Sequence, residues 1–246
     1  MSKRSWVSTN INCQNCSISQ LCLPYTLDNA SLDKLDDIIE RKRPYRKGEQ
    51  LFQAGQPLKS LFAVRSGSFK SFTLSNEGDA QITGFHLPGD LIGFDSVHSS
   101  TYTSFAESLE TSMVCEIPFT SLELLSDQLP LLRRQVMRLM SSEISADKQM
   151  MSLLNHKSAE QRLATFLLDF SERFKSRGLS SKEFRLSMTR AEIGNYLGLT
   201  VETVSRLLSK LHKERIIEVD GKFILLLNFD MLQQLSGIQI RACVSS

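Results

Sequence analysis

The pattern of apolar and polar residues divides the chain into a strand-like first half and a helical second half. From about residue 44 to 118, seven of the twelve glycines separate short runs rich in Phe, Leu, Ile, Val and Thr, such as residues 61–64 and 69–74. Short strands with turn residues at such intervals are typical of an antiparallel barrel or jelly roll. We therefore predict an antiparallel β-roll over this stretch.

A long helix is predicted to follow Pro130, because no further Gly or Pro occurs before residue 154. Alternating spacings of four and three place a stripe of mainly apolar residues on one face, as in a heptad seam. The stripe consists of Met137, Met140, Ile144, Asp147, Met151 and Leu154. It fits either a dimer seam or the buried face of a single surface helix, and by itself it does not decide between them.

Three capped helices are predicted further along the chain. Residues 158–161 form a capping-box pattern, and the helix that follows ends at Gly178 and presents Leu163, Phe166, Leu167, Phe170 and Phe174. Residues 189–192 form a second capping box, whose helix ends at Gly198, and Thr200 is the predicted N-cap of the next helix. Two short helices joined by a glycine-containing turn are typical of a helix-turn-helix.

The second helix of this unit has two chemically different faces. At about 100° per residue, one stripe consists of Val201, Val204, Leu207, Leu208 and Leu211, and the opposite half presents Glu202, Ser205, Arg206 and Ser209. Arginine can pair with guanine, glutamate can accept from cytosine, and serine can bond bases or phosphate. A solvated amphipathic helix is the alternative, but it leaves the preceding capped helix and the following hairpin unexplained.

We expect that hairpin at residues 216–219 and 223–227, with Asp220 and Gly221 as a two-residue turn, which would form the wing of a winged helix. The combination favours DNA binding through the exposed face.

Composition narrows the class of protein. No apolar run reaches the roughly 18 residues of a membrane span, and the first residues lack the apolar stretch of a signal peptide, so we expect a cytoplasmic protein without membrane contact. Residues 157–222 contain 13 Lys and Arg against 9 Asp and Glu, which fits a phosphate-binding surface or an ordinary solvated face. The chain has no His-Glu-x-x-His or dinucleotide-binding glycine motif, so we do not expect an enzyme.

The cysteines form a second candidate site. Cys13, Cys16 and Cys22 fall within ten residues, and Cys115 can supply a fourth ligand from a strand-like stretch. Four cysteines suit a structural zinc ion or an iron–sulfur cluster. The spacing fits paired zinc knuckles poorly and favours the cluster, while a chain without metal stays an alternative. Cys243 has no partner in the sequence, and we expect no role for it.

The motifs together resemble the superfamily of cyclic-nucleotide receptors and anaerobic regulators, and within it the fumarate and nitrate reduction regulators of bacteria. The resemblance rests on Cys-Gln-Asn-Cys-Ser-Ile-Ser-Gln-Leu-Cys, on Ile-Thr-Gly-Phe-His-Leu and on Gly-Asn-Tyr-Leu-Gly-Leu-Thr-Val-Glu-Thr-Val-Ser-Arg. It implies that Cys13, Cys16, Cys22 and Cys115 hold an oxygen-labile 4Fe-4S cluster. It also implies a homodimer on a TTGAT-like palindrome of double-stranded DNA, read by Glu202, Ser205 and Arg206.

The resemblance implies an α+β architecture in four segments. They are a cysteine-rich lobe over residues 1–28, a β-roll sensor over 29–124, a dimerisation helix over 125–156 and a winged helix-turn-helix over 157–246. We expect the dimer interface to include Arg133, Met137, Met140, Ile144, Asp147 and Met151.

Two features depart from the relatives. Phe94 and Thr103 stand where cyclic-nucleotide receptors hold the phosphate with Glu and Arg, so we expect no cyclic nucleotide to bind. The loop at Gly78 and Asp79 resembles a surface that contacts RNA polymerase, an expected partner, but Ala80 stands where an acidic residue is expected.

Asp147 is the charged residue in the seam. In a parallel dimer two such carboxylates about 4 Å apart repel by roughly 1 kcal/mol in water and about 4 kcal/mol at an effective dielectric near 20. We hypothesise that this repulsion opposes dimerisation until the cluster is built, unless Asp147 lies off the seam and is simply solvated.

Overall fold

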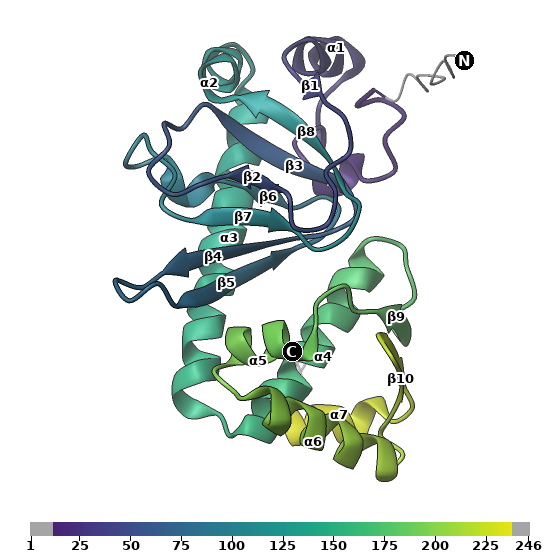
Figure 1. Ribbon diagram of the computed structural model, residues 1–246. Helices are drawn as coiled ribbons and strands as arrows, with labels where there is room; N and C mark the ends of the chain where they lie inside the picture. Colours follow the sequence, from purple (N-terminus) through teal and green to yellow (C-terminus); the bar gives the residue numbers. More distant parts are fainter. Residues whose placement is uncertain (1–11, 238–246) are drawn as a thin grey trace, which may run out of the picture.

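A long helix connects a strand-rich upper half of the molecule to a helical lower half (Figure 1). The computed structural model describes residues 12–237, so part of the expected lobe over 1–28 and also Cys243 lie outside the described residues. The upper half contains η1 (Ser19–Leu21), α1 (Asn29–Asp37), β1 (Glu40–Arg41), β2 (Gln50–Phe52), β3 (Ser60–Ser66), β4 (Phe69–Leu74), β5 (Ala80–His86), β6 (Leu91–Ile92), η2 (Phe94–Ser96), β7 (Phe105–Ser108), β8 (Met113–Pro118) and α2 (Phe119–Gln128). The connecting helix is α3 (Pro130–His156). The lower half contains α4 (Ala159–Ser176), β9 (Glu183–Arg185), α5 (Arg190–Leu197), α6 (Val201–Lys213), β10 (Ile217–Asp220), β11 (Phe223–Leu226) and α7 (Phe229–Ser236).

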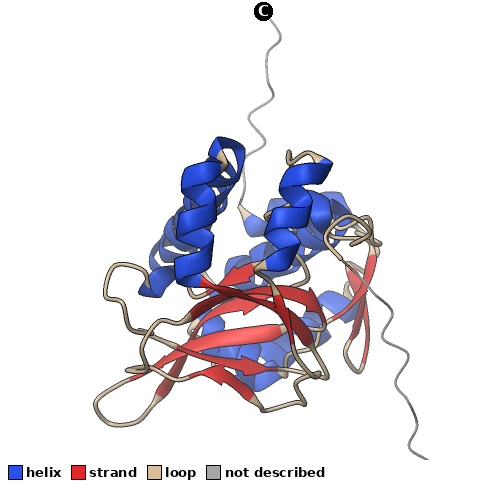
Figure 2. Ribbon diagram, turned by 90° about the horizontal axis from the view of Figure 1, so that it is seen from above, coloured by secondary structure: helices blue, strands red, loops and turns tan. Residues whose placement is uncertain are grey.

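The predicted antiparallel β-roll is confirmed. Its strands form two four-stranded sheets, in the orders β1-β8-β3-β6 and β2-β7-β4-β5, and neighbouring strands in both sheets are antiparallel. Aromatic side chains from both sheets fill the space between them; the rings of Phe52 and Tyr102 stack with centroids 3.8 Å apart. Figure 2 looks down on this roll and shows α1 and α2 side by side next to it.

The long helix begins at Pro130, and α2 is a separate helix that ends at Gln128. Leu129 between them has an extended backbone (φ −120°, ψ 92°), as expected for a residue before proline. The helix expected from residue 125 is therefore two helices. Along α3, Leu132 and Gln135 are buried against the upper half. Among the described residues, no helix has the length and apolar character to cross a membrane.

Local capping explains the helices of the lower half. Both expected capping boxes are present, at Ser158 for α4 and Thr189 for α5, and Thr200 caps α6. The α4 face expected to be apolar is the centre of the lower core: Leu163, Phe166, Leu167 and Phe170 are at most 2% exposed. The same core contains residues of α5, α6 and the hairpin, so α4 and α6 are packed as one unit.

The wing hairpin forms one residue later than expected. Asp220 pairs with Phe223, which leaves Gly221 and Lys222 as the two turn residues and not Asp220 and Gly221. Gly221 has φ +57°, and Lys222 is not among the residues with positive φ, a combination typical of a type II′ turn. The expected Asp-Gly turn would require positive φ at Asp220, which the ladder does not allow.

Candidate functional site

The helix-turn-helix is fixed by close backbone contacts. Gly198 ends α5 with φ +64°, and the amide of Leu199 donates to the carbonyl of Gly194 at 2.8 Å. A Cβ added to Gly194 would lie 2.6 Å from the carbonyl oxygen of Leu199, so only glycine fits where the turn crosses the first helix. The Thr200 hydroxyl then accepts from the amide of Thr203 at 3.2 Å and starts α6.

The face of α6 that carries Glu202, Ser205 and Arg206, called the recognition face below, is open to solvent. Val204 and Leu211 are fully buried, whereas Glu202 and Arg206 are exposed, one helical turn apart, and Ser205 is half-buried beside them. Val201, which the periodicity places in the buried stripe, is 40% exposed, because the first residue of the helix extends beyond the core under it. The three predicted base-reading residues therefore lie together on an accessible surface.

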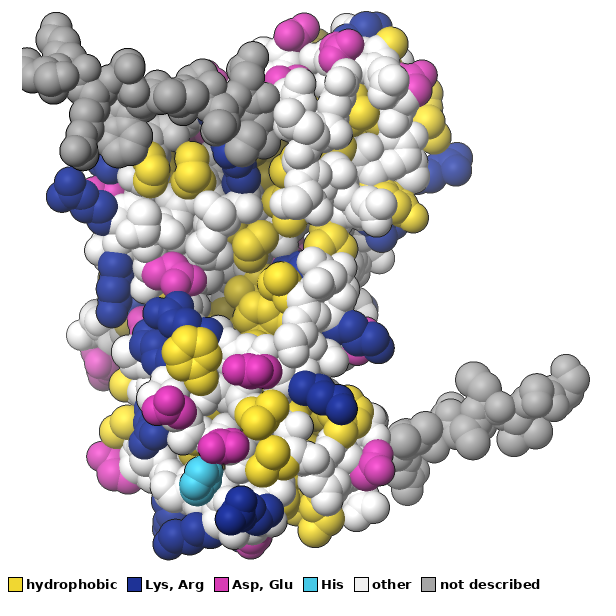
Figure 3. Space-filling view, turned by 90° about the vertical axis from the view of Figure 1, so that its right-hand side faces the viewer, with side chains coloured by type: hydrophobic (Ala, Val, Ile, Leu, Met, Phe, Trp, Pro, Cys, Tyr) yellow, Lys and Arg dark blue, Asp and Glu magenta, His cyan; other side chains and the backbone are white. Residues whose placement is uncertain are grey.

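Charge on the lower half is mixed. Lys210, His212 and Lys213 lie in the last turn of α6, but Lys210 is paired with Glu160 at 2.8 Å. Figure 3 likewise shows basic and acidic side chains interspersed over the lower end of one face. The excess of basic over acidic residues in this part of the sequence therefore does not form one continuous basic patch on that face.

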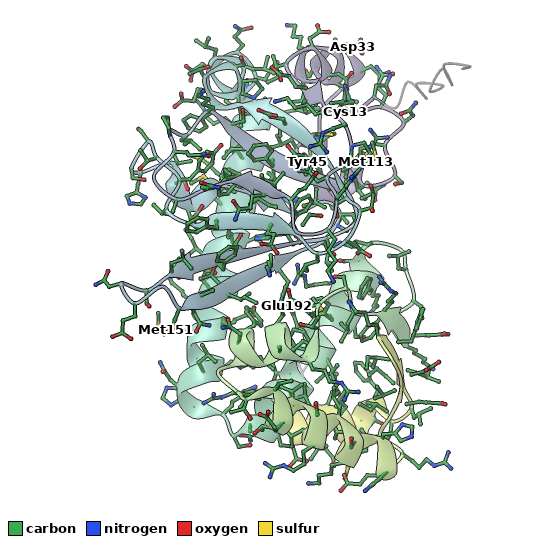
Figure 4. All side chains as sticks on the ribbon, in the orientation of Figure 1. Cys13, Asp33, Tyr45, Met113, Met151 and Glu192 are labelled. Atoms are coloured by element: carbon green, nitrogen blue, oxygen red, sulfur yellow. The ribbon has the colours of Figure 1, made fainter. Side chains whose placement is uncertain are left out.

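The four candidate cysteine ligands line one small cavity between the lobe, β3 and β8. Cys13 and Cys22 are buried, Cys16 and Cys115 are half-buried, and none is in a disulfide. Figure 4 labels Cys13 at the upper end of the molecule, far from Glu192 at the junction of the two halves. Cys115 is thus brought to the three lobe cysteines, from which it is separated by 93 or more positions in the chain.

The cysteine cavity disfavours free thiolates. Burial raises the pKa of Cys13 far above its usual value, and Asp36, Cys115 and Cys22 raise it further. Burial also raises the pKa of Cys22 to about 12. Among residues 12–237, no three Cys, His, Asp or Glu side chains converge on a single metal ion. Four cysteine thiols around one cavity are a donor set that an iron–sulfur cluster or a structural zinc ion can use, and the positive charge of either would offset the repulsion between the thiolates.

Sequence reasoning missed three side chains that hold the cysteine lobe in place. Asp36 accepts from the amide of Cys13 at 2.8 Å and is itself paired with Arg41. Gln135 of α3, only 3% exposed, donates through Nε2 to the carbonyl of Cys22 at 2.9 Å. These partners lie far from the cysteines in sequence, and only the fold brings them together.

The seam of α3 is largely exposed. Met137, Ile144 and Met151 are 64%, 53% and 65% exposed, and Arg133 and Asp147 are exposed as well. Only Met140 of the expected interface packs partly against the core. Desolvation by the neighbouring protein and the nearby Asp95 carboxylate raise the pKa of Asp147 although its side chain reaches solvent. Apolar side chains at helical spacing are thus available to a second surface.

The two positions compared with cyclic-nucleotide receptors lie in or near η2 and make only internal contacts in this structure. Phe94 is buried, and the hydroxyl of Thr103 donates to the carboxylate of Asp95 at 3.0 Å. Ser104 donates to the same carboxylate at 2.8 Å. Thr103 and Ser104 thus share one carboxylate partner.

The loop at Gly78 and Asp79 joins β4 to β5 and is exposed. Its base is fixed by the lower half: the side-chain amide of Asn195 in α5 donates to the carbonyl of Ala80 at 2.7 Å and accepts from the amide of Ile82 at 2.6 Å.

Known proteins resemble the chain over nearly all of its length. A model for Crp-like helix-turn-helix domains matches residues 161–235, and one for cyclic nucleotide-binding domains matches residues 42–128. The chain is 58% identical to Electron transport regulator A of Shewanella oneidensis and 59% identical to the Fumarate and nitrate reduction regulatory protein of Escherichia coli (strain K12). Each match covers 92% of this chain and 91% of the relative.

A solved structure supports the same grouping. FixK2 from Bradyrhizobium japonicum is 32% identical, with a TM-score of 0.75 over 82% of this chain and 99% of that one. The fold, the helix-turn-helix and these matches agree. The chain therefore belongs to the fumarate and nitrate reduction regulators, a family of DNA-binding transcription regulators that are not enzymes.

Proposed function

We propose that this protein is an oxygen-responsive regulator that binds a palindromic TTGAT-like DNA site as a homodimer. In the active form Cys13, Cys16, Cys22 and Cys115 hold a 4Fe-4S cluster. The observation that carries the proposal is the meeting of these four cysteines around one cavity beside α3. When bound, such a cluster supplies an iron–thiolate connection between the lobe and β8 that oxygen degrades.

The chain's own contacts explain how the lobe can influence α3. Gln135 donates to the carbonyl of Cys22, and the guanidinium of Arg138 lies over the ring of Tyr25 at 5.0 Å. A fixed lobe therefore restrains the first turns of α3, the helix that presents the exposed seam. We infer that this restraint favours seam packing in a second copy and offsets the repulsion between the two Asp147 side chains.

DNA reading is assigned to Glu202, Ser205 and Arg206, whose side chains lie on the accessible face of α6. A dimer places two such helices about one turn of DNA apart, which matches a palindrome. RNA polymerase is the proposed partner of the exposed loop at Gly78 and Asp79. Cyclic nucleotides are not proposed as ligands, because Asp95 would repel their phosphate.

Anaerobic purification tests the cofactor. Iron and acid-labile sulfide in equal amounts, with visible absorption and palindrome binding that are lost in air, are the expected results. Single Cys→Ser changes at the four positions should each abolish the absorption, whereas Cys243→Ser, the matched control, should not. Zinc without sulfide would overturn the proposed cluster and leave a regulator of the same fold that responds to another signal.

Asp147→Ala tests the dimer step. The lost repulsion, roughly 1–4 kcal/mol, corresponds to a dimer about five- to several-hundredfold tighter. We expect the variant to dimerise and to bind the palindrome in air. A variant that sediments as a monomer in air would contradict an electrostatic role for Asp147.

Arg206→Ala tests base reading. The variant is expected to lose about 1–3 kcal/mol on the palindrome and much less on random DNA. An equal loss on both DNAs would mean that Arg206 contacts only phosphate.

A further inference from the structure

The turn between β5 and β6, residues 87–90, touches both the cysteine lobe and the lower half. Gly89 has φ +98°, and a Cβ placed on it would lie 2.8 Å from the Cβ of Leu21, so Leu21 of the lobe packs directly on the turn. The turn is closed by its own hydrogen bonds: the amide of Leu87 donates to the Asp90 carboxylate at 2.8 Å, and the amide of Asp90 donates to the carbonyl of Leu87 at 3.0 Å.

Two arginines of α4 hold this turn from the other side. Arg177 reaches Oδ1 of Asp90 at 2.6 Å, and Arg173 reaches Oδ2 at 2.7 Å. The same guanidinium groups donate to backbone carbonyls, Arg177 to Pro88 at 2.7 Å and Arg173 to Phe85 at 2.6 Å. The Arg177 side chain is only 6% exposed. The Arg173 and Asp90 side chains are 23% and 29% exposed. Charge-assisted bonds from two guanidinium groups to one carboxylate have a narrow range of allowed geometries.

We call the bonds from Arg173 and Arg177 to residues 87–90 the Asp90 clamp. A change in this clamp would affect DNA reading because α4 and α6 share one core. Phe166 and Leu167 of α4 pack in the same cluster as Val204 and Leu211 of α6. A rotation of α4 on the β-roll would therefore rotate the recognition face of α6 relative to the seam of α3.

We propose that Asp90 is a positioning residue for DNA binding, which sets the orientation of the recognition helix relative to the dimer seam. The inference rests on the proposed function, because orientation matters only when two linked half-sites are read together.

Another ion pair between the two halves provides the matched control. Arg185 and Glu110 lie 2.8 Å apart, but their side chains are 44% and 32% exposed, and exposed pairs contribute little. Removing the Asp90 charge leaves two arginines without their shared partner. Removing the Glu110 charge leaves one solvated arginine, and the glutamine oxygen can still accept from the Ser68 hydroxyl, which donates to Glu110 at 2.9 Å. The two carboxylates are similarly exposed, at 29% and 32%, so Asp90→Asn and Glu110→Gln differ in the number and burial of the arginines that lose a partner and not in the kind of change.

The experiment measures anaerobic binding of the full chain to palindromes whose half-sites are one base pair closer or further apart. The wild type should favour one spacing. Asp90→Asn should lose roughly tenfold or more at that spacing and show a flatter preference among spacings. Glu110→Gln should behave as wild type, and Arg206→Ala should lose affinity without a flatter preference, because it alters reading and not orientation.

Cluster absorption and sedimentation establish that each variant is loaded and dimeric. Should Asp90→Asn fail to fold, Arg177→Lys, which keeps the charge but loses the paired donors, is expected to flatten the preference to a smaller extent. A folded, dimeric variant with unchanged spacing preference would overturn the proposal.

Hydrogen exchange in metal-free protein tests the clamp separately from the cluster. Exchange at residues 85–90 and 171–177 should accelerate in Asp90→Asn and not in Glu110→Gln. Equal exchange in both variants would refute the clamp, whereas failure of the wild type to bind a cluster or a palindrome would refute only the proposed function.

Discussion

Glu143 of α3 makes the free energy of unfolding depend on pH, and this dependence can be measured directly. Burial, together with repulsion from Asp95, Asp147 and Asp90, raises the pKa of its carboxyl from 4.5 to about 8. Between these two pH values the folded protein holds a proton that the unfolded chain has released, so the free energy of unfolding falls as the pH rises. At about 1.4 kcal/mol per pKa unit, the upper bound of this loss at pH 7.5 is about 4 kcal/mol.

Solvent around the partly exposed neighbouring carboxylates reduces the expected loss to about 1–3 kcal/mol. Glu143→Gln removes the ionisable group, so its thermal midpoint at pH 7.5 should exceed that of the wild type by roughly 2–12 °C, at 2–4 °C per kcal/mol for a chain of this size. At pH 5 the two proteins should melt within about 2 °C of each other.

Differential scanning calorimetry of metal-free protein at both pH values makes the comparison. Glu172→Gln, at a side chain that is 70% exposed, serves as the control and should not gain stability selectively at pH 7.5. An equal gain for Glu143→Gln at pH 5 and pH 7.5 would show that the change acts through packing. No gain at either pH would refute the burial of an unfavourable charge.

Three further changes test the architecture of the lower half. Thr200→Ala removes the N-cap of α6 and should cost about 1 kcal/mol in chemical unfolding; an unchanged midpoint would mean that the cap is replaced. Gly194→Ala places a Cβ against the Leu199 carbonyl and should cost about 1–3 kcal/mol and weaken DNA binding, as followed by circular dichroism and gel shift. Phe166→Ala opens the shared core and should cost about 3–5 kcal/mol, whereas a loss below 1 kcal/mol would show that the core collapses around the gap.

Local sequence patterns predict the helices of this protein well because the determinants are local. The caps at Ser158, Thr189 and Thr200 are formed by residues three positions apart, and the same range fixes the buried stripe of α6. Errors occur where a local pattern meets the rest of the fold: the wing turn moves by one residue because Asp220 joins the ladder, and Val201 extends past the core.

The contacts that organise the candidate sites join residues that are distant in sequence. The bond from Gln135 to Cys22 spans 113 positions, and the pair of Arg177 and Asp90 spans 87. No periodicity relates such residues, and a buried glutamine or arginine in a sequence looks like any surface residue. The spacing of the cysteines and the resemblance to a family pointed to the four candidate ligands, but only the fold identified what holds the lobe, the turn and α4 together.

The amide of Asn195 also has a consequence for solubility. β5 is an outer strand of its sheet, and such strands expose backbone groups to which a strand of another molecule can add. Asn195 binds the carbonyl of Ala80 and the amide of Ile82 and so takes the place of a neighbouring strand. The contact that joins the two halves therefore also blocks one route to aggregation, and a molecule whose halves separate offers these groups to its neighbours.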